Sequence, residues 1–150
     1  MKSIIRNGCL LGLACLLLLL AGCAPSLEFA RTNFYGYEEI SSELDVLSRR
    51  NPDIVSITKA GETYEGRSLY VVRVGQASQA ERTKPGLMTV FAQHAGEHET
   101  TSLAVGVIKY LAENYQKDKT IAGLLKNTEL WIVPMMNPDG VAYDLSGAVT

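Results

Sequence analysis

The chain has 150 residues, 47% of them apolar, and a formal net charge of −2. This is long and apolar enough for one domain with a hydrophobic core, and it excludes a disordered chain. Because the charge is mildly acidic and no Lys/Arg cluster occurs, we expect no nucleic-acid partner.

The first 22 residues have the pattern of a signal peptide. They begin with Lys2 and Arg6 and continue as an apolar run from Cys9 to Ala21. This run is shorter than the roughly 20 apolar residues that span a bilayer comfortably, and its shape is that of a secretory leader. The ending "LAGC" resembles the bacterial lipobox, which implies cleavage before Cys23 and lipidation of that residue.

Lipidation would make residues 23–34 a tether between a membrane and the domain, since several acyl chains give a stable anchor. We therefore expect a lipid-anchored protein of the cell envelope, facing the periplasm or the exterior. The alternative is a plain signal peptide with an incidental cysteine. Cys9 and Cys15 leave with the leader, so the mature chain keeps only Cys23. A disulfide framework, a thiolate metal site and a cysteine nucleophile are thereby excluded.

The next segment predicts a helix followed by two strands. In "YEEISSELDVLSRR" the apolar residues have helical spacing, and Asn51-Pro52 ends the helix. Strands are predicted at about 54–59 and 68–74, joined by a turn that contains Glu65-Gly66-Arg67. The short apolar run at 87–92 predicts a buried strand.

A longer helix is predicted after this strand. It is expected to begin between Glu99 and Ser102, a region rich in N-cap residues, and to end near Tyr115. Its predicted apolar stripe consists of Leu103, Val107, Ile108 and Leu111. A second helical piece at about 119–125 precedes a strand at 129–133, with Trp131 in the core. Asn137, Asp139 and Gly140 predict a turn after this strand.

Strands that alternate with helices predict an α/β domain with a mixed, mainly parallel sheet flanked by helices. In such sheets, sites form beyond the carboxyl ends of strands. His94 lies one or two residues after a predicted strand and before a helix. The predicted architecture therefore places His94 where a site is expected.

"FAQHAGEHETTS", residues 91–102, contains both histidines of the chain, with two glutamates beside them. Imidazole nitrogen and carboxylate oxygen are both good Zn²⁺ ligands. A turn that leads into a helix brings His94 and Glu97 to one side, so both can reach one metal ion. The spacing alone is a weak signal, because a histidine near a strand end is often only a hydrogen-bonded residue.

Three blocks in this order resemble the zinc carboxypeptidase family, the M14 or funnelin type. "GETYEGR" at 61–67 is similar to the family's G-x-S-x-x-G-R turn, with Thr63 in the place of Ser. "QHAGEHE" at 93–99 is similar to its H-x-x-E zinc motif. "VPMMNPDGVAY" at 133–143 is similar to its P-x-x-NPDG-x-x-Y segment. The resemblance implies that His94 and Glu97 ligate Zn²⁺ in an enzyme that hydrolyses peptides, where Glu97 is a ligand and not the general base.

The resemblance also implies that part of the family's active site lies outside residues 1–150. The family's third zinc ligand, its general base and its substrate-binding arginines follow NPDG at positions beyond Thr150. We therefore expect residues 35–150 to form the N-terminal part of the domain, to be inactive alone, and to expose apolar surface at an open sheet edge. Gly96 stands where digestive members have an arginine that helps contact the substrate, which argues against digestive-type use of that subsite. For a bacterial surface enzyme we expect a peptide substrate, with cell-wall peptides as one candidate.

Two other interpretations remain open. "HAGEH" also fits the H-x-x-E-H pattern of inverzincins, in which His94 and His98 are ligands and Glu97 is the base. That geometry requires a helix through the motif, and Gly96 disfavours one by up to about 1 kcal/mol. The chain could also be an anchored binding module or an inactive remnant with this fold, because fold does not imply function.

Overall fold

The computed structural model describes residues 34–77 and 84–147. The predicted leader, Cys23 and nearly all of the tether lie outside the described residues. The described elements are α3 (Tyr37–Arg50), β1 (Val55–Glu62), β2 (Ser68–Val74), β3 (Gly86–Val90), α4 (His98–Asn114), α5 (Lys119–Asn127), β4 (Glu129–Val133) and α6 (Pro138–Leu145).

The described strands form one sheet in the order β1-β2-β4-β3. β1 and β2 are antiparallel because a short turn joins them, and Gly66 in this turn has a φ of 80°. β2 and β4 are also antiparallel, whereas β3 and β4 are parallel and connected through α4 and α5. The mixed α/β class is confirmed. Among these strands only one of the three pairings is parallel, which corrects the expectation that most strands of the sheet are parallel.

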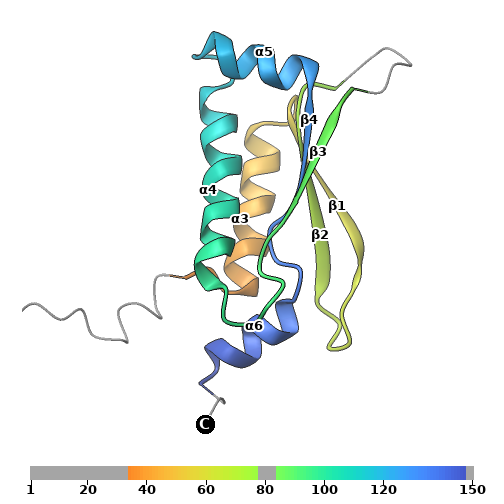
Figure 1. Cartoon of the computed structure of the whole chain (residues 1–150), viewed down its shortest axis with the longest axis vertical. Helices are drawn as coiled ribbons and strands as arrows, with labels where there is room; N and C mark the ends of the chain where they lie inside the picture. Colours follow the sequence, from red (N-terminus) through yellow and green to blue (C-terminus); the bar gives the residue numbers. More distant parts are fainter. Residues whose placement is uncertain (1–33, 78–83, 148–150) are drawn as a thin grey trace, which may run out of the picture. The chain divides into compact units, whose positions relative to one another are not determined.

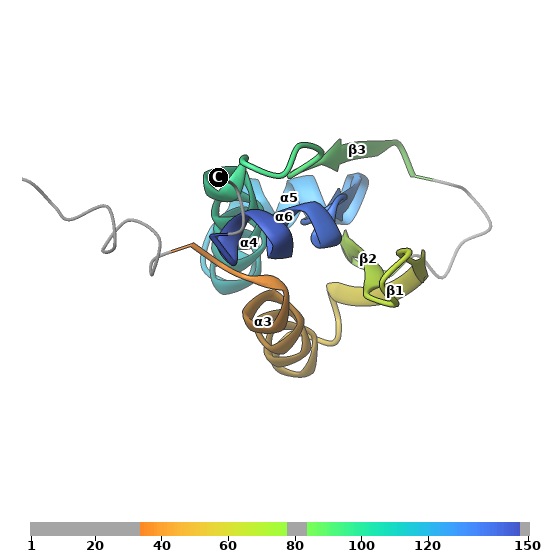
Figure 2. The same ribbon diagram turned by 90° about the horizontal axis from the view of Figure 1, so that it is seen from below.

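α3 and α4 lie side by side along one face of the sheet (Figures 1 and 2). The helix α3 forms where its sequence pattern predicts, with glutamates in its first turn and arginines in its last turn, as the helix dipole favours. The core between helices and sheet includes Ile40, Leu44, Val72, Val74, Val105, Ile108 and Ile132. Within residues 34–77 and 84–147, no helix has the length and apolar content that membrane crossing requires.

β3 is an edge strand of the described sheet, which corrects the prediction of a buried strand at 87–92. Leu87 and Met88 are 55% and 61% exposed. Trp131 is only partly buried, because it alternates with the buried Ile132 and therefore points away from the helix-covered face. Figure 2 shows no described element over that second face. The expected open edge and exposed apolar surface are thus present among the described strands.

The buried stripe of α4 differs from the predicted one. Ile108 and Leu111 are buried as expected, but Leu103 is 58% exposed. The small residues Ala104 and Ala112 face the core instead. Because alanine permits close approach of the helix to the sheet, the buried face is rotated from the one that the larger side chains predicted.

The NPDG segment begins a helix, which refines the predicted turn. Asn137 is the N-cap of α6, and its side chain accepts a hydrogen bond from the Gly140 amide at 3.0 Å. Pro138 occupies the first turn, where its missing N–H is not needed. The same residues that form turns therefore start a helix here.

Candidate metal site at the end of β3

The segment 91–97 connects β3 to α4 and is held by the last residue of β4 and the chain that follows it. The Phe91 amide donates to the Val133 carbonyl at 2.9 Å. In return, the Met136 amide donates to the Phe91 carbonyl at 2.9 Å, and the Asn137 amide donates to the Ala92 carbonyl at 3.0 Å. The segment thus lies beyond the carboxyl ends of the parallel pair β3–β4, where a site was predicted.

His94 and Glu97 lie together within this segment. His94 Nδ1 is 2.7 Å from Glu97 Oε1, and the His94 amide donates to Glu97 Oε2 at 3.3 Å. The side chains of His94 and Glu97 are 82% and 41% exposed. The hydrogen bond from the His94 side chain is the main cause that lowers the pKa of Glu97. Glu97 is therefore an anion at neutral pH, as a metal ligand must be.

The donor chemistry of this pair fits part of a zinc site. One imidazole nitrogen and one carboxylate oxygen approach each other at an exposed position, where an ion could reach both. Among the described residues, no group of three or more His, Cys, Asp or Glu side chains is placed to hold a metal ion. The pair would thus supply two ligands, and the remaining positions would be filled by other groups.

His98 lies apart from this pair. As the first residue of α4 it directs Nε2 to Asp144 Oδ2 of α6 at 2.5 Å, and only 12% of its side chain is exposed. The ring of Phe34 stacks on it at 5.7 Å. Because the helix begins at His98, His94 is not on a helix with it, and the i, i+4 geometry of the H-x-x-E-H interpretation is absent.

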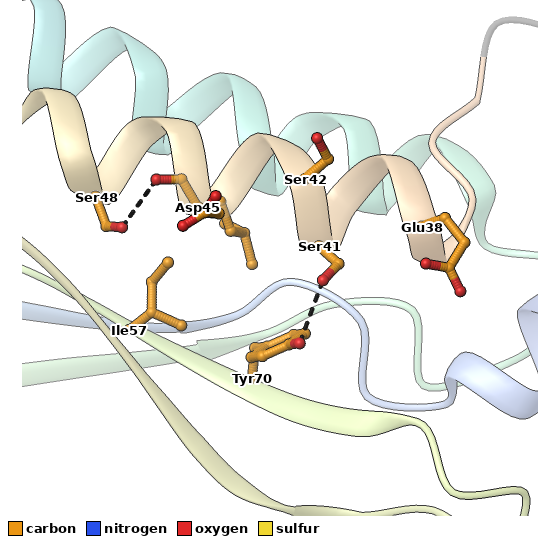
Figure 3. A pocket seen from close by; sticks show the side chains of 8 residues that line it. Glu38, Ser41, Ser42, Asp45, Ser48, Ile57 and Tyr70 are labelled. Carbon is orange, nitrogen blue, oxygen red and sulfur yellow. Dashed lines mark hydrogen bonds between the residues drawn. The ribbon is translucent and has the colours of Figure 1, made fainter.

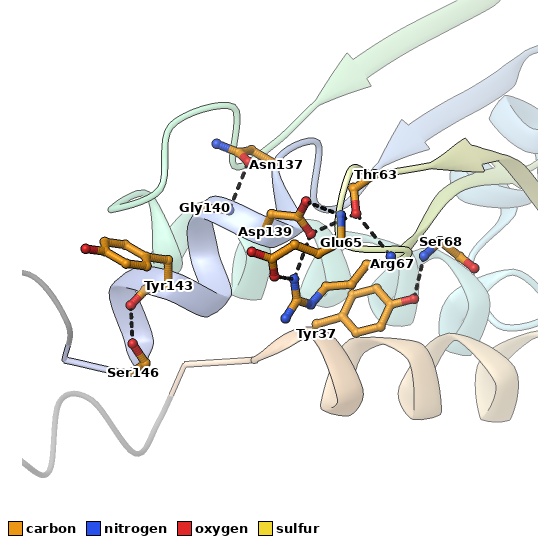
Figure 4. Close-up of polar contacts among 10 residues, drawn as sticks. All are labelled: Tyr37, Thr63, Glu65, Arg67, Ser68, Asn137, Asp139, Gly140, Tyr143 and Ser146. Carbon is orange, nitrogen blue, oxygen red and sulfur yellow. Dashed lines mark hydrogen bonds and ion pairs between the residues drawn. The ribbon is translucent and has the colours of Figure 1, made fainter.

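A second polar cluster connects the β1–β2 turn to α6 (Figure 4). Thr63 Oγ1 and Arg67 Nη1 each donate to Asp139 Oδ1 at 2.7 Å, and the Glu65 amide donates to Asp139 Oδ2 at 3.1 Å. Partial burial raises the pKa of Asp139, but the hydrogen bonds from Thr63 and Arg67 outweigh it and leave the pKa lowered. Arg67 therefore has a structural role here, as a turn residue paired with a carboxylate.

A groove of about 550 Å³ lies between α3 and the β1–β2 hairpin (Figure 3). The Ser41 and Tyr70 hydroxyl groups meet in it at 3.2 Å, and this contact is the main cause that lowers the pKa of Tyr70. Neither His94 nor Glu97 lines this groove. It is therefore separate from the candidate metal site.

The contacts that two residues, Thr100 and Asp144, make at the site were not predicted from the sequence. Thr100 accepts a hydrogen bond from the Ala92 amide and donates one to the Glu97 carbonyl. Asp144 pairs with His98 across 46 positions, and no local pattern could have indicated that pair. The helix start at Asn137 did have a signal, because Asn followed by Pro is typical of an N-cap and the first helical position.

Comparison with known proteins agrees with this geometry. The family model of the zinc carboxypeptidases, peptidase family M14, matches residues 40–149. A zinc carboxypeptidase of Saccharothrix mutabilis subsp. capreolus is 30% identical over 115 residues, which are 77% of this chain and 26% of that protein. Carboxypeptidase A4 of Mus musculus is 30% identical over 125 residues, 83% of this chain and 29% of that protein.

Solved structures show the same likeness in three dimensions. Thrombin-activatable fibrinolysis inhibitor superposes with a TM-score of 0.69 at 28% identity, over 81% of this chain and 30% of that one. A metallo-carboxypeptidase from Burkholderia cenocepacia gives 0.64 at 28% identity, over 71% and 28%. The chain therefore belongs to the zinc carboxypeptidase family. It spans between a quarter and a third of the length of the relatives named here.

Proposed function

We propose that this chain supplies part of the active site of a zinc-dependent carboxypeptidase, with His94 and Glu97 as two of the zinc ligands. The observation that carries the proposal is the 2.7 Å approach of His94 Nδ1 to Glu97 Oε1 beyond β3, in a chain of the zinc carboxypeptidase family. Bound zinc would supply an activated water and polarise a peptide carbonyl. The exposure of His94 leaves the site open to a peptide substrate.

In this proposal Glu97 is a ligand, and the third ligand and general base belong to the part of the family domain that this chain does not span. The placement of His98 supports this assignment over the inverzincin alternative, since its Nε2 is engaged with Asp144 on another helix. The family membership supports an enzyme over a binding module. Sequence beyond codon 150 that encodes a further His and Glu would separate an enzyme from an inactive remnant.

We also propose that Cys23 carries the lipid anchor, which would hold the domain at the cell envelope with access to surface peptides, including cell-wall peptides. The support is the sequence pattern of residues 1–23, a basic start, an apolar run and the "LAGC" ending. Two or more acyl chains suffice for stable membrane attachment.

The metal assignment can be tested by NMR, because the chain has only two histidines. We expect Zn²⁺ titrated into the purified chain to shift the imidazole signals of His94, and to leave those of His98 unchanged. Binding should be weak, since two protein ligands fill half of a tetrahedral site. Glu97→Ala should weaken the response, and His98→Ala should preserve it.

Two results would contradict the assignment. Zinc shifts at His98 that disappear in His98→Ala would favour the inverzincin alternative. Equal zinc binding by the original chain and a His94→Ala variant would show that this pair is not a metal site.

A further inference from the structure

The Thr100 hydroxyl group joins the two ends of the segment that contains the proposed ligands. Thr100 Oγ1 accepts a hydrogen bond from the Ala92 amide at 3.0 Å, and it donates one to the Glu97 carbonyl at 2.7 Å. A hydroxyl group has one hydrogen to donate and can accept as well, so both bonds can form at once. One side-chain atom therefore links the chain before His94 to the backbone of Glu97.

The first of these bonds holds a residue with an uncommon backbone conformation. Ala92 has a φ of 48°, in the left-handed region that a residue with a Cβ seldom adopts, and it is fully buried. Its amide is held by Thr100, and its carbonyl accepts from the Asn137 amide. Such a conformation persists only where surrounding contacts determine it. The chain changes direction here, two residues before His94.

The second bond fixes the start of α4 at Glu97. Glu97 is the N-cap residue, but its side chain makes no capping hydrogen bond, because the carboxylate is directed to His94. The Thr100 side chain and amide both donate to the Glu97 carbonyl instead, at 2.7 and 3.1 Å. The Glu97 carboxylate is therefore left available to bind a metal ion, while the Glu97 backbone is held in place.

We infer that Thr100 is a positioning residue for the proposed zinc site, an inference that rests on the function proposed above. By tying Ala92 to Glu97, the hydroxyl group fixes the span between the strand end and the helix start. This span sets the separation of His94 and Glu97. In this role Thr100 would act through the backbone of this segment, by its hydrogen bonds to Ala92 and Glu97, and not as a metal ligand.

The neighbouring Thr101 provides a matched control. It is the same residue type in the same helical turn and is fully buried, but its Oγ1 has no hydrogen-bond partner among the described residues. Thr→Val keeps the shape of the side chain and removes the hydroxyl group. The substitution at Thr101 therefore tests the loss of a hydroxyl group that holds nothing, and at Thr100 the loss of one that holds the segment.

The experiment compares Zn²⁺ titrations of the purified chain with those of Thr100→Val, Thr100→Ser and Thr101→Val, following the His94 imidazole signals. Residues that orient metal ligands typically contribute 10–100-fold in metal affinity. We expect Thr100→Val to weaken zinc binding by about 10-fold, at the lower end of this range because Thr100 acts through the backbone. Thr100→Ser should restore binding and Thr101→Val should leave it unchanged. Zinc binding by Thr100→Val as tight as by the original chain would overturn the inference.

Amide hydrogen exchange gives a second readout that needs no metal. Thr100→Val should speed exchange at the Ala92 amide, which loses its acceptor, while Thr101→Val should not. If the original chain and His94→Ala bind zinc equally, the proposed function fails. Exchange over residues 92–97 then still decides whether Thr100 orders the segment, and unchanged exchange in Thr100→Val overturns the inference.

Discussion

Replacing Ala92 by glycine should cost far less stability than the same replacement at another fully buried alanine. Ala92 and Ala104 are both fully buried, but Ala92 has a φ of 48° and Ala104 lies within α4. Ala104→Gly removes a buried methyl group worth about 0.8 kcal/mol and about 1 kcal/mol of helix propensity, so we expect a loss of about 2 kcal/mol.

Ala92→Gly removes the same methyl group but relieves a left-handed conformation that costs a residue with a Cβ about 1–2 kcal/mol. The greater freedom of glycine in the unfolded chain offsets part of this gain. We therefore expect a change in the free energy of unfolding within about 1 kcal/mol of zero, taking these opposing contributions together.

Urea unfolding followed by far-UV circular dichroism would measure both variants under one set of conditions. The comparison depends on the difference between the two substitutions, because the lost methyl group is common to both. If Ala92→Gly were destabilised as much as Ala104→Gly, the backbone at Ala92 would not be under strain. The account of this segment as one held by its neighbours would then be wrong.

Three further outcomes can be checked separately. Cys23→Ser should abolish incorporation of labelled acyl chains, and continued incorporation would refute the lipid anchor. Asp139→Asn should reduce the loss of stability in acid. Because the pKa of Asp139 is lowered in the folded chain, its carboxylate stabilises the fold at pH values above its ordinary pKa of 3.8. This stabilisation disappears as the pH falls through the lower pKa of the folded chain. Urea midpoints between pH 7 and pH 3 would show whether the two chains converge. Met88→Lys should reduce self-association measured by sedimentation velocity, since a charge protects an exposed edge strand, whereas Leu103→Lys on α4 should have a smaller effect.

The parts of the fold that depend on local pattern were predictable from the sequence. α3 follows from the spacing of its apolar residues and from Asn51, whose side chain donates to the Leu47 carbonyl at the helix end. The exposure of β3 was not predictable, because an apolar run has the same pattern whether or not other strands and helices cover it. The prediction that Leu103 is buried was wrong for a related reason, since residue size alone does not determine which face of α4 approaches the sheet.

The candidate site also has features that the sequence predicts and features that it does not. His94 and Glu97 were recognisable because their chemistry and spacing lie within four positions of the chain, and the structure brings them together. Whether they ligate zinc stays a prediction. The role of Thr100 depends on the conformation of Ala92, which no propensity would assign to alanine. Thr100 was therefore predictable only as one of several residues suited to a helix start.

The helix α6, which begins within the third motif block, contacts the hairpin turn of the first block and the segment that contains the second. Asp139 accepts a hydrogen bond from Arg67 in the hairpin turn, and the Asn137 amide donates one to the Ala92 carbonyl, which precedes the proposed ligands. Asp144, one and a half turns further along α6, holds the first residue of α4. Because α6 contacts the hairpin, the ligand segment and α4, a displacement of α6 would disturb all three. The NPDG segment therefore supports the site by holding its parts in fixed positions. In the hydrogen bonds of the described residues, none of its side chains contacts His94 or Glu97.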